Sequence, residues 1–188
     1  MDNTTVLIVT VVVAVAVIVF VVMAIVAMLR GARASRLRGK FGTEYDRTVN
    51  EVGRRRAEAV LHDRESRVNT FDLRPLRPGE RERYMDAWRS IQAEFVDQPI
   101  AAAIRADALL SEIMAVRGYP VSDFDQRAAD LSVGHANVVS DYRAAHDIVL
   151  RHGRGETTTE DLRQAMIHYR SLFEELVDAP EAALRRAS

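Results

Sequence analysis

The chain begins with a long uncharged apolar run, from Val6 to Leu29. It spans 24 residues, of which eleven are valine and only Thr10 is polar. As a helix this run is about 36 Å long, against a hydrocarbon core of about 30 Å, and in lipid a helix satisfies its own backbone groups. The pattern therefore predicts a transmembrane helix over 6–29, after a short N-terminal flank over 1–5.

A cleaved signal peptide is the alternative interpretation of the same segment. Ala32-Arg33-Ala34 before Ser35 has the small-x-small pattern of a cleavage site, and cutting there would produce a secreted protein. However, no Lys or Arg precedes Val6, and the run exceeds the roughly 7–15 apolar residues of a cleaved signal. These two features favour an uncut anchor.

A basic juxtamembrane linker follows over 30–42. Positive charge in short flanking loops stays on the cytoplasmic side, and the 1–5 flank contains no Lys or Arg. We therefore expect a single-pass protein of the plasma membrane with its C-terminal domain in the cytoplasm. The cations expected to contact the lipid headgroups are Arg30, Arg33, Arg36, Arg38 and Lys40.

The next segment, 43–69, is highly charged and carries only a thin apolar stripe at helical spacing. The residues of this stripe are Tyr45, Val49, Val52, Ala59 and Val60. We predict an exposed helical stalk with a weak point at Gly53, since glycine destabilises a helix interior. A short parallel coiled coil, and hence a homo-oligomer, is the alternative.

Pro75 and Pro78 disfavour helix in the residues before them, so 70–79 is predicted to be a linker. A compact helical domain of about five helices is expected over 80–178, with a flexible tail over 179–188, and a fragment from Thr70 is expected to fold alone. The fold class is therefore all-α, since no stretch alternates with the period of a strand.

Local signals place the ends of the five helices, because Gly and Pro stop helices while Asp, Ser and Thr cap them. These signals are Asp97 with Pro99, Gly118 before Pro120, Ser122 or Asp123, Gly153 with Gly155, and Thr157 with Glu160 as a capping box. The residues expected in the core are Trp88, Phe95, Leu109, Ile113, Tyr142, Phe173 and Leu176.

Several short motifs together resemble a family of bacterial proteins. They are "FGTEYDRTV", "FVDQP", "RGYPVSDF", "RAADLSV", "YRAAH" and "TTEDLRQAMIHYRSLF", and they cover nearly the whole chain from about Phe41 onward. The family comprises uncharacterised single-pass membrane proteins, often labelled hypothetical or secreted, with one N-terminal transmembrane helix and a helical C-terminal domain. The resemblance supports this architecture and implies no catalytic residues. The stretch "VGHANVV", around Gly134 and Ala136, departs from the family pattern.

The residue composition excludes several kinds of functional site. The chain has no cysteine, which excludes disulfides, thiolate zinc sites and cysteine nucleophiles. No two histidines are three or four residues apart, as a helical metal site requires. Glu58, His62 and Glu65 share a helical face, but a solvated ion-pair face is the more ordinary interpretation. Metal and other cofactors are therefore not expected.

The remaining candidate for chemistry is His146, one helical turn after Tyr142, with Asp130 and Asp141 near it in sequence. A partly buried histidine without a catalytic role is the simpler interpretation, since no ordered nucleophile can be named. "RHGRGE", 151–156, lacks the glycine spacing of a phosphate loop and is expected to be a flexible interhelix loop.

Charge is divided along the chain. Residues 30–67 hold 11 basic against 6 acidic side chains, and residues 68–188 hold 15 against 20. Arg54, Arg55 and Arg56 are diluted by acids and lack interleaved aromatic residues, which argues against nucleic acid. We therefore expect a membrane-anchored interaction or scaffold module with a protein partner, and not an enzyme. The alternative is a ligand-binding or hydrolytic domain with a pocket around Tyr142 and His146.

Overall fold

The computed structural model describes residues 3–120 and 122–178, so part of the predicted 1–5 flank and the whole 179–188 tail lie outside the described residues. The described residues form helices and no strand, as the all-α prediction requires. The chain divides into two compact units, Met1–Gly39 and Lys40–Ser188.

Helix α1, Asn3–Phe41, covers the predicted apolar segment and also most of the predicted 30–42 linker, which is therefore helical. Its side chains from Val17 to Ile25 are all exposed. Among the described residues, no helix is long and apolar enough to cross a membrane. The side chains of 3–16, 26, 27 and 29 lie outside the described part of the chain.

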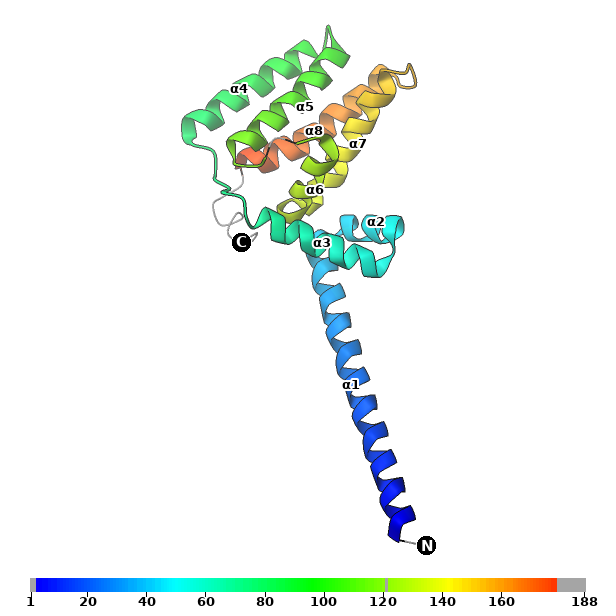
Figure 1. Cartoon of the computed structure of the whole chain (residues 1–188). Helices are drawn as coiled ribbons and strands as arrows, with labels where there is room; N and C mark the ends of the chain where they lie inside the picture. Colours follow the sequence, from blue (N-terminus) through cyan, green and yellow to red (C-terminus); the bar gives the residue numbers. More distant parts are fainter. Residues whose placement is uncertain (1–2, 121, 179–188) are drawn as a thin grey trace. The chain divides into compact units, whose positions relative to one another are not determined.

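The predicted stalk differs from the structure. Residues 43–68 form two short helices, α2 (Thr43–Val52) and α3 (Arg54–Val68), which pack against each other as a hairpin (Figure 1). Gly53 joins them with a φ of 78°, in the left-handed region that glycine tolerates best, so the weak point predicted there is where the helix ends.

This hairpin packs into the Lys40–Ser188 unit instead of standing apart from it. Helix α3 contacts α6, Phe124–Gly134, and α2 contacts α7, Ala136–His152. The buried face of α3 includes Ala57 and Leu61, both fully buried, whereas the predicted stripe had named their neighbours Ala59 and Val60. The stripe was offset because charged residues share the buried face, so apolar periodicity alone did not identify it.

The five predicted helices of the compact part are present. They are α4 (Pro78–Glu94), α5 (Pro99–Val116), α6, α7 and α8 (Thr159–Asp178). Helix α5 packs against both α4 and α8, and α8 packs against α7 (Figure 1). Small residues make this close packing of α5 feasible: Ala102, Ala103 and Ala106 are fully buried.

Six of the seven predicted core residues are buried, namely Trp88, Leu109, Ile113, Tyr142, Phe173 and Leu176. Phe95 is the exception and is only partly buried, because α4 ends at Glu94 and Phe95 occupies the cap position beyond it.

The helix ends follow the predicted signals with two shifts of one residue. Asp123 caps α6 by accepting a hydrogen bond from the Gln126 backbone N–H at 2.9 Å. Gln98, rather than Asp97, is the N-cap of α5. At α8 the capping pair is Thr158 with Asp161, through bonds of 2.7 Å and 3.3 Å, instead of Thr157 with Glu160. Both residues of the real pair suit the same capping geometry.

The linker before α4 is held firmly against the end of α5. The backbone N–H of Arg74 donates to the Arg117 carbonyl at 3.0 Å. Gly118 has a φ of 96°, and a Cβ there would overlap the Asp72 carbonyl oxygen. Only glycine therefore fits both the backbone conformation and the close approach.

Candidate functional site

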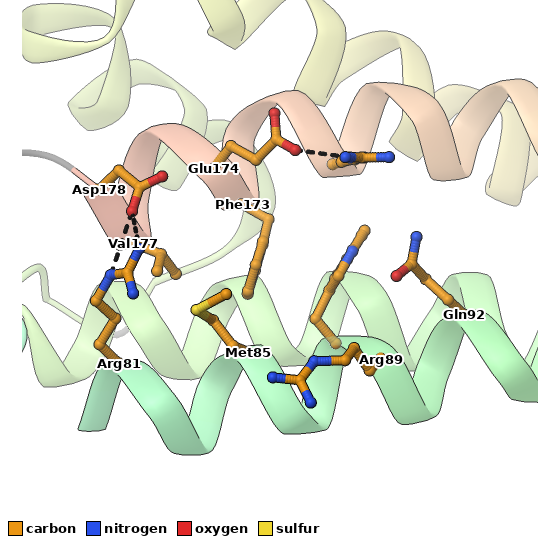
Figure 2. Close-up of a pocket in the computed structure, with 10 residues that line it drawn as sticks. Arg81, Met85, Arg89, Gln92, Phe173, Glu174, Val177 and Asp178 are labelled. Carbon is orange, nitrogen blue, oxygen red and sulfur yellow. Dashed lines mark hydrogen bonds and ion pairs between the residues drawn. The ribbon is translucent and has the colours of Figure 1, made fainter. Parts of the chain in front are cut away.

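A hollow in the described surface lies between α4 and α8. It has a volume of about 320 Å³, with an apolar floor and a charged rim (Figure 2). Five residues from each helix line it: Arg81, Met85, Trp88, Arg89 and Gln92 from α4, and Arg170, Phe173, Glu174, Val177 and Asp178 from α8. Because both helices pack on α5, the hollow is supported from beneath by a third helix.

The floor is formed by aromatic and aliphatic side chains that reach across from the two helices. The Trp88 and Phe173 rings stack with centroids 4.7 Å apart and an interplanar angle of 15°. Met85 lies beside Phe173, and Val177 follows one turn later on α8 (Figure 2). A stacked aromatic pair adds roughly 0.5–1.5 kcal/mol beyond its buried area, so this part of the floor is well fixed.

The rim consists of ion pairs in contact with water. Arg81 Nε donates to Asp178 at 3.2 Å, across the two helices, and Arg170 Nε donates to Glu174 at 2.7 Å along α8 (Figure 2). These side chains are between 44% and 60% exposed. Exposed pairs of this kind contribute roughly 0–1 kcal/mol each, so they can be exchanged for other partners at small cost.

A second hollow of about 200 Å³ continues the first towards the other end of the same two helices. Its lining residues are Gln92, Phe95, Arg163, Met166, Ile167 and Arg170. Gln92 and Arg170 border both hollows. We refer to the two together as the α4/α8 groove.

The groove is elongated, and its two walls run in opposite directions. On one side the lining extends from Arg81 of α4 to Phe95, the cap residue after α4, while on α8 it extends from Asp178 back to Arg163. Fourteen helical steps at about 1.5 Å per residue give a length of about 21 Å. The charged lining residues comprise four arginines, at 81, 89, 163 and 170, against two acids, Glu174 and Asp178.

A buried ion cluster forms a second distinctive feature, where the α2–α3 hairpin meets α7. The Glu44 side chain is only 2% exposed and accepts hydrogen bonds from Arg47 Nε at 2.9 Å, Arg143 Nε at 3.1 Å and Arg64 Nη1 at 3.4 Å. Burial alone would raise the pKa of Glu44, but the arginines outweigh it and hold the pKa below its ordinary value. The cluster is thus a structural link between three helices.

The residues predicted to contact the membrane surface lie in different environments. Lys40 Nζ lies 2.8 Å from Glu65 of α3, so this cation has a partner within its own unit. Arg36 and Arg38 are exposed. The side chains of Arg30 and Arg33 lie outside the described residues, so the prediction for them stays open.

Tyr142 and His146, around which a pocket was the alternative prediction, lie in a polar cluster between helices. Tyr142 is fully buried, its hydroxyl lies 3.3 Å from Arg127 Nε, and burial raises its pKa. The His146 ring stacks on Phe124 at 3.6 Å between centroids, and burial lowers its pKa. Asp107, on α5, is the carboxylate near these groups, with Oδ2 3.7 Å from Arg127. These contacts link α5, α6 and α7 through a partly buried polar cluster.

The two aspartates considered with His146 belong to other contacts. Asp130 Oδ2 accepts from Arg67 of α3 at 3.3 Å, and Asp141 pairs with His168 at 3.2 Å. Burial raises the pKa of the Asp130 carboxyl. Both residues therefore hold helices together.

The three residues considered as a weak metal site, Glu58, His62 and Glu65, have separate surroundings. Glu58 accepts from Arg54 at 3.2 Å, Glu65 accepts from Lys40, and His62 is exposed. Across residues 3–120 and 122–178, no group of three or more acidic or histidine side chains is placed to hold a metal ion.

The sequence pattern did not indicate that the groove residues form a site. Trp88 and Phe173 were predicted only as core, and the arginines around them were not singled out. One signal was present, because Arg81 and Arg89 are eight residues apart and so share the helical face of Met85.

No protein-family profile, curated protein or solved structure matches this chain. The resemblance to single-pass bacterial membrane proteins therefore stays a prediction from the motifs. Any function must be inferred from the chemistry of the chain itself.

Proposed function

We propose that this chain is a single-pass membrane protein whose helical unit, Lys40–Ser188, binds a protein partner at the cytoplasmic face of the plasma membrane. It acts as an anchored interaction module and not as an enzyme. The anchor is the segment 6–29, and the partner surface is the α4/α8 groove.

The observation that carries the proposal is the exposure of α1. Nine consecutive residues, Val17 to Ile25, are exposed, and at about 100° per residue nine positions cover every face of a helix. The large apolar members are between 47% and 70% exposed. A helix that is apolar on all sides needs an apolar environment all around it, and a lipid bilayer supplies one.

The groove supports the second half of the proposal. An exposed hollow with an aromatic floor and a rim of exchangeable ion pairs resembles the anatomy of a protein interface, with an apolar centre and a polar edge. A small ligand is the alternative occupant, since about 320 Å³ is at the lower limit of ligand pockets. The floor offers such a ligand few polar groups for orientation, which favours the protein partner.

The anchor is tested by placing charge in α1. Val19→Arg with Val22→Arg should release the full-length chain from membranes into the soluble fraction, because each Arg near the centre of a span costs roughly 2.5–3.5 kcal/mol. The matched control carries the same two added charges on the exposed positions Asn50 and Ser66. It should remain in the membrane pellet after carbonate extraction. A wild-type chain that carbonate extracts completely would refute the anchor.

Orientation is tested with reporters fused after Ser188. A reporter that works only in the cytoplasm should be active, and one that works only outside should be inactive. An active outside reporter on a mature chain that begins at Ser35 would instead establish a secreted protein.

A further inference from the structure

We propose that the α4/α8 groove binds an amphipathic helix of a partner protein whose apolar stripe is flanked by Asp and Glu. This inference rests on the proposed function and specifies its partner.

The shape of the groove fits a helix of about four turns. A length of about 21 Å corresponds to about 14 helical residues. The α4 wall contributes lining residues at intervals of three or four positions, at 81, 85, 88, 92 and 95. A helix laid along such a wall inserts side chains at i, i+3 or i+4, and i+7, which is the usual mode of helix recognition in a groove.

The floor has two places for apolar anchors. One lies above the Trp88 and Phe173 rings, in the larger hollow. The other lies beside Phe95 and Ile167, the latter 43% exposed, in the smaller hollow. Two apolar anchors about two turns apart would therefore bury side chains in both hollows, with Gln92 and Arg170 between them.

The charges of the rim favour acidic flanks on the partner. Arg89 and Arg163 line the groove, whereas the carboxylates that pair with them, Asp86 and Glu160, do not. Those pairs are more than half exposed, so a carboxylate of the partner can replace Asp86 or Glu160 with little loss. The lining as a whole has four cations and two anions, an excess of two positive charges.

The same charges disfavour a second copy of this chain as the occupant. In a symmetric dimer the same patch contacts itself, so two grooves with the same excess of two positive charges would meet. Like charges across an interface oppose association. A partner of complementary charge does not have this cost.

The chain supplies its own reporter for the test, because Trp88 is its only tryptophan and lies in the floor of the groove. The full-length chain is placed in nanodiscs of phosphatidylcholine, which has no net charge. Two tryptophan-free helical peptides are titrated: one has a leucine stripe flanked by Glu, and the other has the same stripe flanked by Lys. We expect the Glu peptide to change Trp88 fluorescence in a saturable way, and the Lys peptide to bind at least about tenfold more weakly.

A second readout does not depend on fluorescence. The chain has no cysteine, so Gln92→Cys introduces a single thiol in the wall between the two hollows. The Glu peptide should slow alkylation of this thiol at the concentrations that change Trp88 fluorescence.

Charge reversal distinguishes charge-dependent recognition from nonspecific apolar binding. Arg89→Glu with Arg163→Glu should weaken the Glu peptide at least about tenfold and should strengthen the Lys peptide. The matched control, Arg55→Glu with Arg56→Glu, makes the same charge change on exposed positions of α3 and should bind like the wild type. Equal binding of both peptides, or an equal effect of both double variants, would overturn the acidic-partner inference.

Two further outcomes are distinguishable. If Trp88 fluorescence depends on the density of the chain in the bilayer and the Glu peptide does not compete, the groove is occupied by a second copy and the inference is wrong. If carbonate extracts the wild-type chain from membranes but the Glu peptide still protects the groove, the anchor fails while the partner inference stands. If the wild-type chain stays in the membrane but the Glu peptide does not bind, the anchor stands and the partner inference fails.

Discussion

Replacing Glu44 by glutamine tests whether the α2–α3 hairpin is a structural part of the Lys40–Ser188 unit. The substitution preserves the shape of the side chain but removes its charge. One acceptor oxygen remains, and the new amide presents N–H donors to guanidinium groups that are themselves donors only. The arginines at 47, 64 and 143 then surround a group that cannot satisfy them.

The expected loss in the free energy of unfolding is about 2–3 kcal/mol. Removing one partner from a fully buried ion pair costs roughly 3–5 kcal/mol. The value is reduced here because the three arginine side chains are 35%, 16% and 18% exposed and so retain some water. Arg47 also keeps its ion pair with Glu51, and Arg143 keeps Asp125 at 3.5 Å. The control, Glu51→Gln, alters a half-exposed pair and should cost less than about 1 kcal/mol.

The assay is urea unfolding of the full-length chain in a mild detergent, followed by Trp88 fluorescence. The pH dependence gives an independent check. Since the pKa of Glu44 is lower in the folded chain than its ordinary value of 4.5, its stabilising contribution is complete above that value and is lost as the pH falls below it. The difference between wild type and Glu44→Gln should therefore be largest near neutral pH and should shrink in acid.

Trp88 lies on α4, away from the hairpin, and this makes the test strict. If Glu44→Gln leaves the Trp88 unfolding midpoint unchanged at neutral pH, the hairpin unfolds separately from α4–α8. The conclusion that 40–69 belongs to the same cooperative unit would then be refuted.

Three other predictions follow from the fold. Gly118→Ala should lower the free energy of unfolding by about 3 kcal/mol, because the backbone conformation is strained for alanine and the new Cβ overlaps the Asp72 carbonyl. Gly79→Ala, where a Cβ meets no neighbouring atom, should leave stability unchanged or raise it. Thermal unfolding of the two variants measures both effects. A fragment over 40–188 should unfold at a higher temperature than one over 70–188, because the shorter fragment loses the α3 side chains buried against α6. Equal thermal unfolding midpoints of the two fragments would support the domain boundary predicted at Thr70. Trp88→Ala should cost about 3–5 kcal/mol in urea unfolding followed by far-UV circular dichroism, since the variant has no tryptophan, and a solvent-like Trp88 emission spectrum in the folded wild type would contradict that expectation.

The compact helices were predictable because their signals are local. Pro99 and Gly118 mark the ends of α5, and Asp123 caps α6, through interactions within a few residues. The shift at α8 is a limit of the same information, since Thr157 and Thr158 are both followed by an acid three residues later. Only the surrounding structure selects the second pair.

The hairpin contacts and the groove were not predictable in this way. Glu44 and Arg143 meet across 99 positions of sequence, and neither residue type indicates burial by itself. Likewise, the apolar spacing of Trp88 and Phe173 is the same whether α4 and α8 close completely or leave a hollow between them. That outcome depends on how a third helix separates them.

The alanines of α5 therefore have a role beyond filling the core. Ala102, Ala103 and Ala106 are fully buried, and they lie on the helix that carries both walls of the groove. A larger side chain at any of these positions would have to displace a neighbouring helix, because a packed core leaves no room for it. If the displaced helix were α4 or α8, the groove would change in width without any change in the residues that line it.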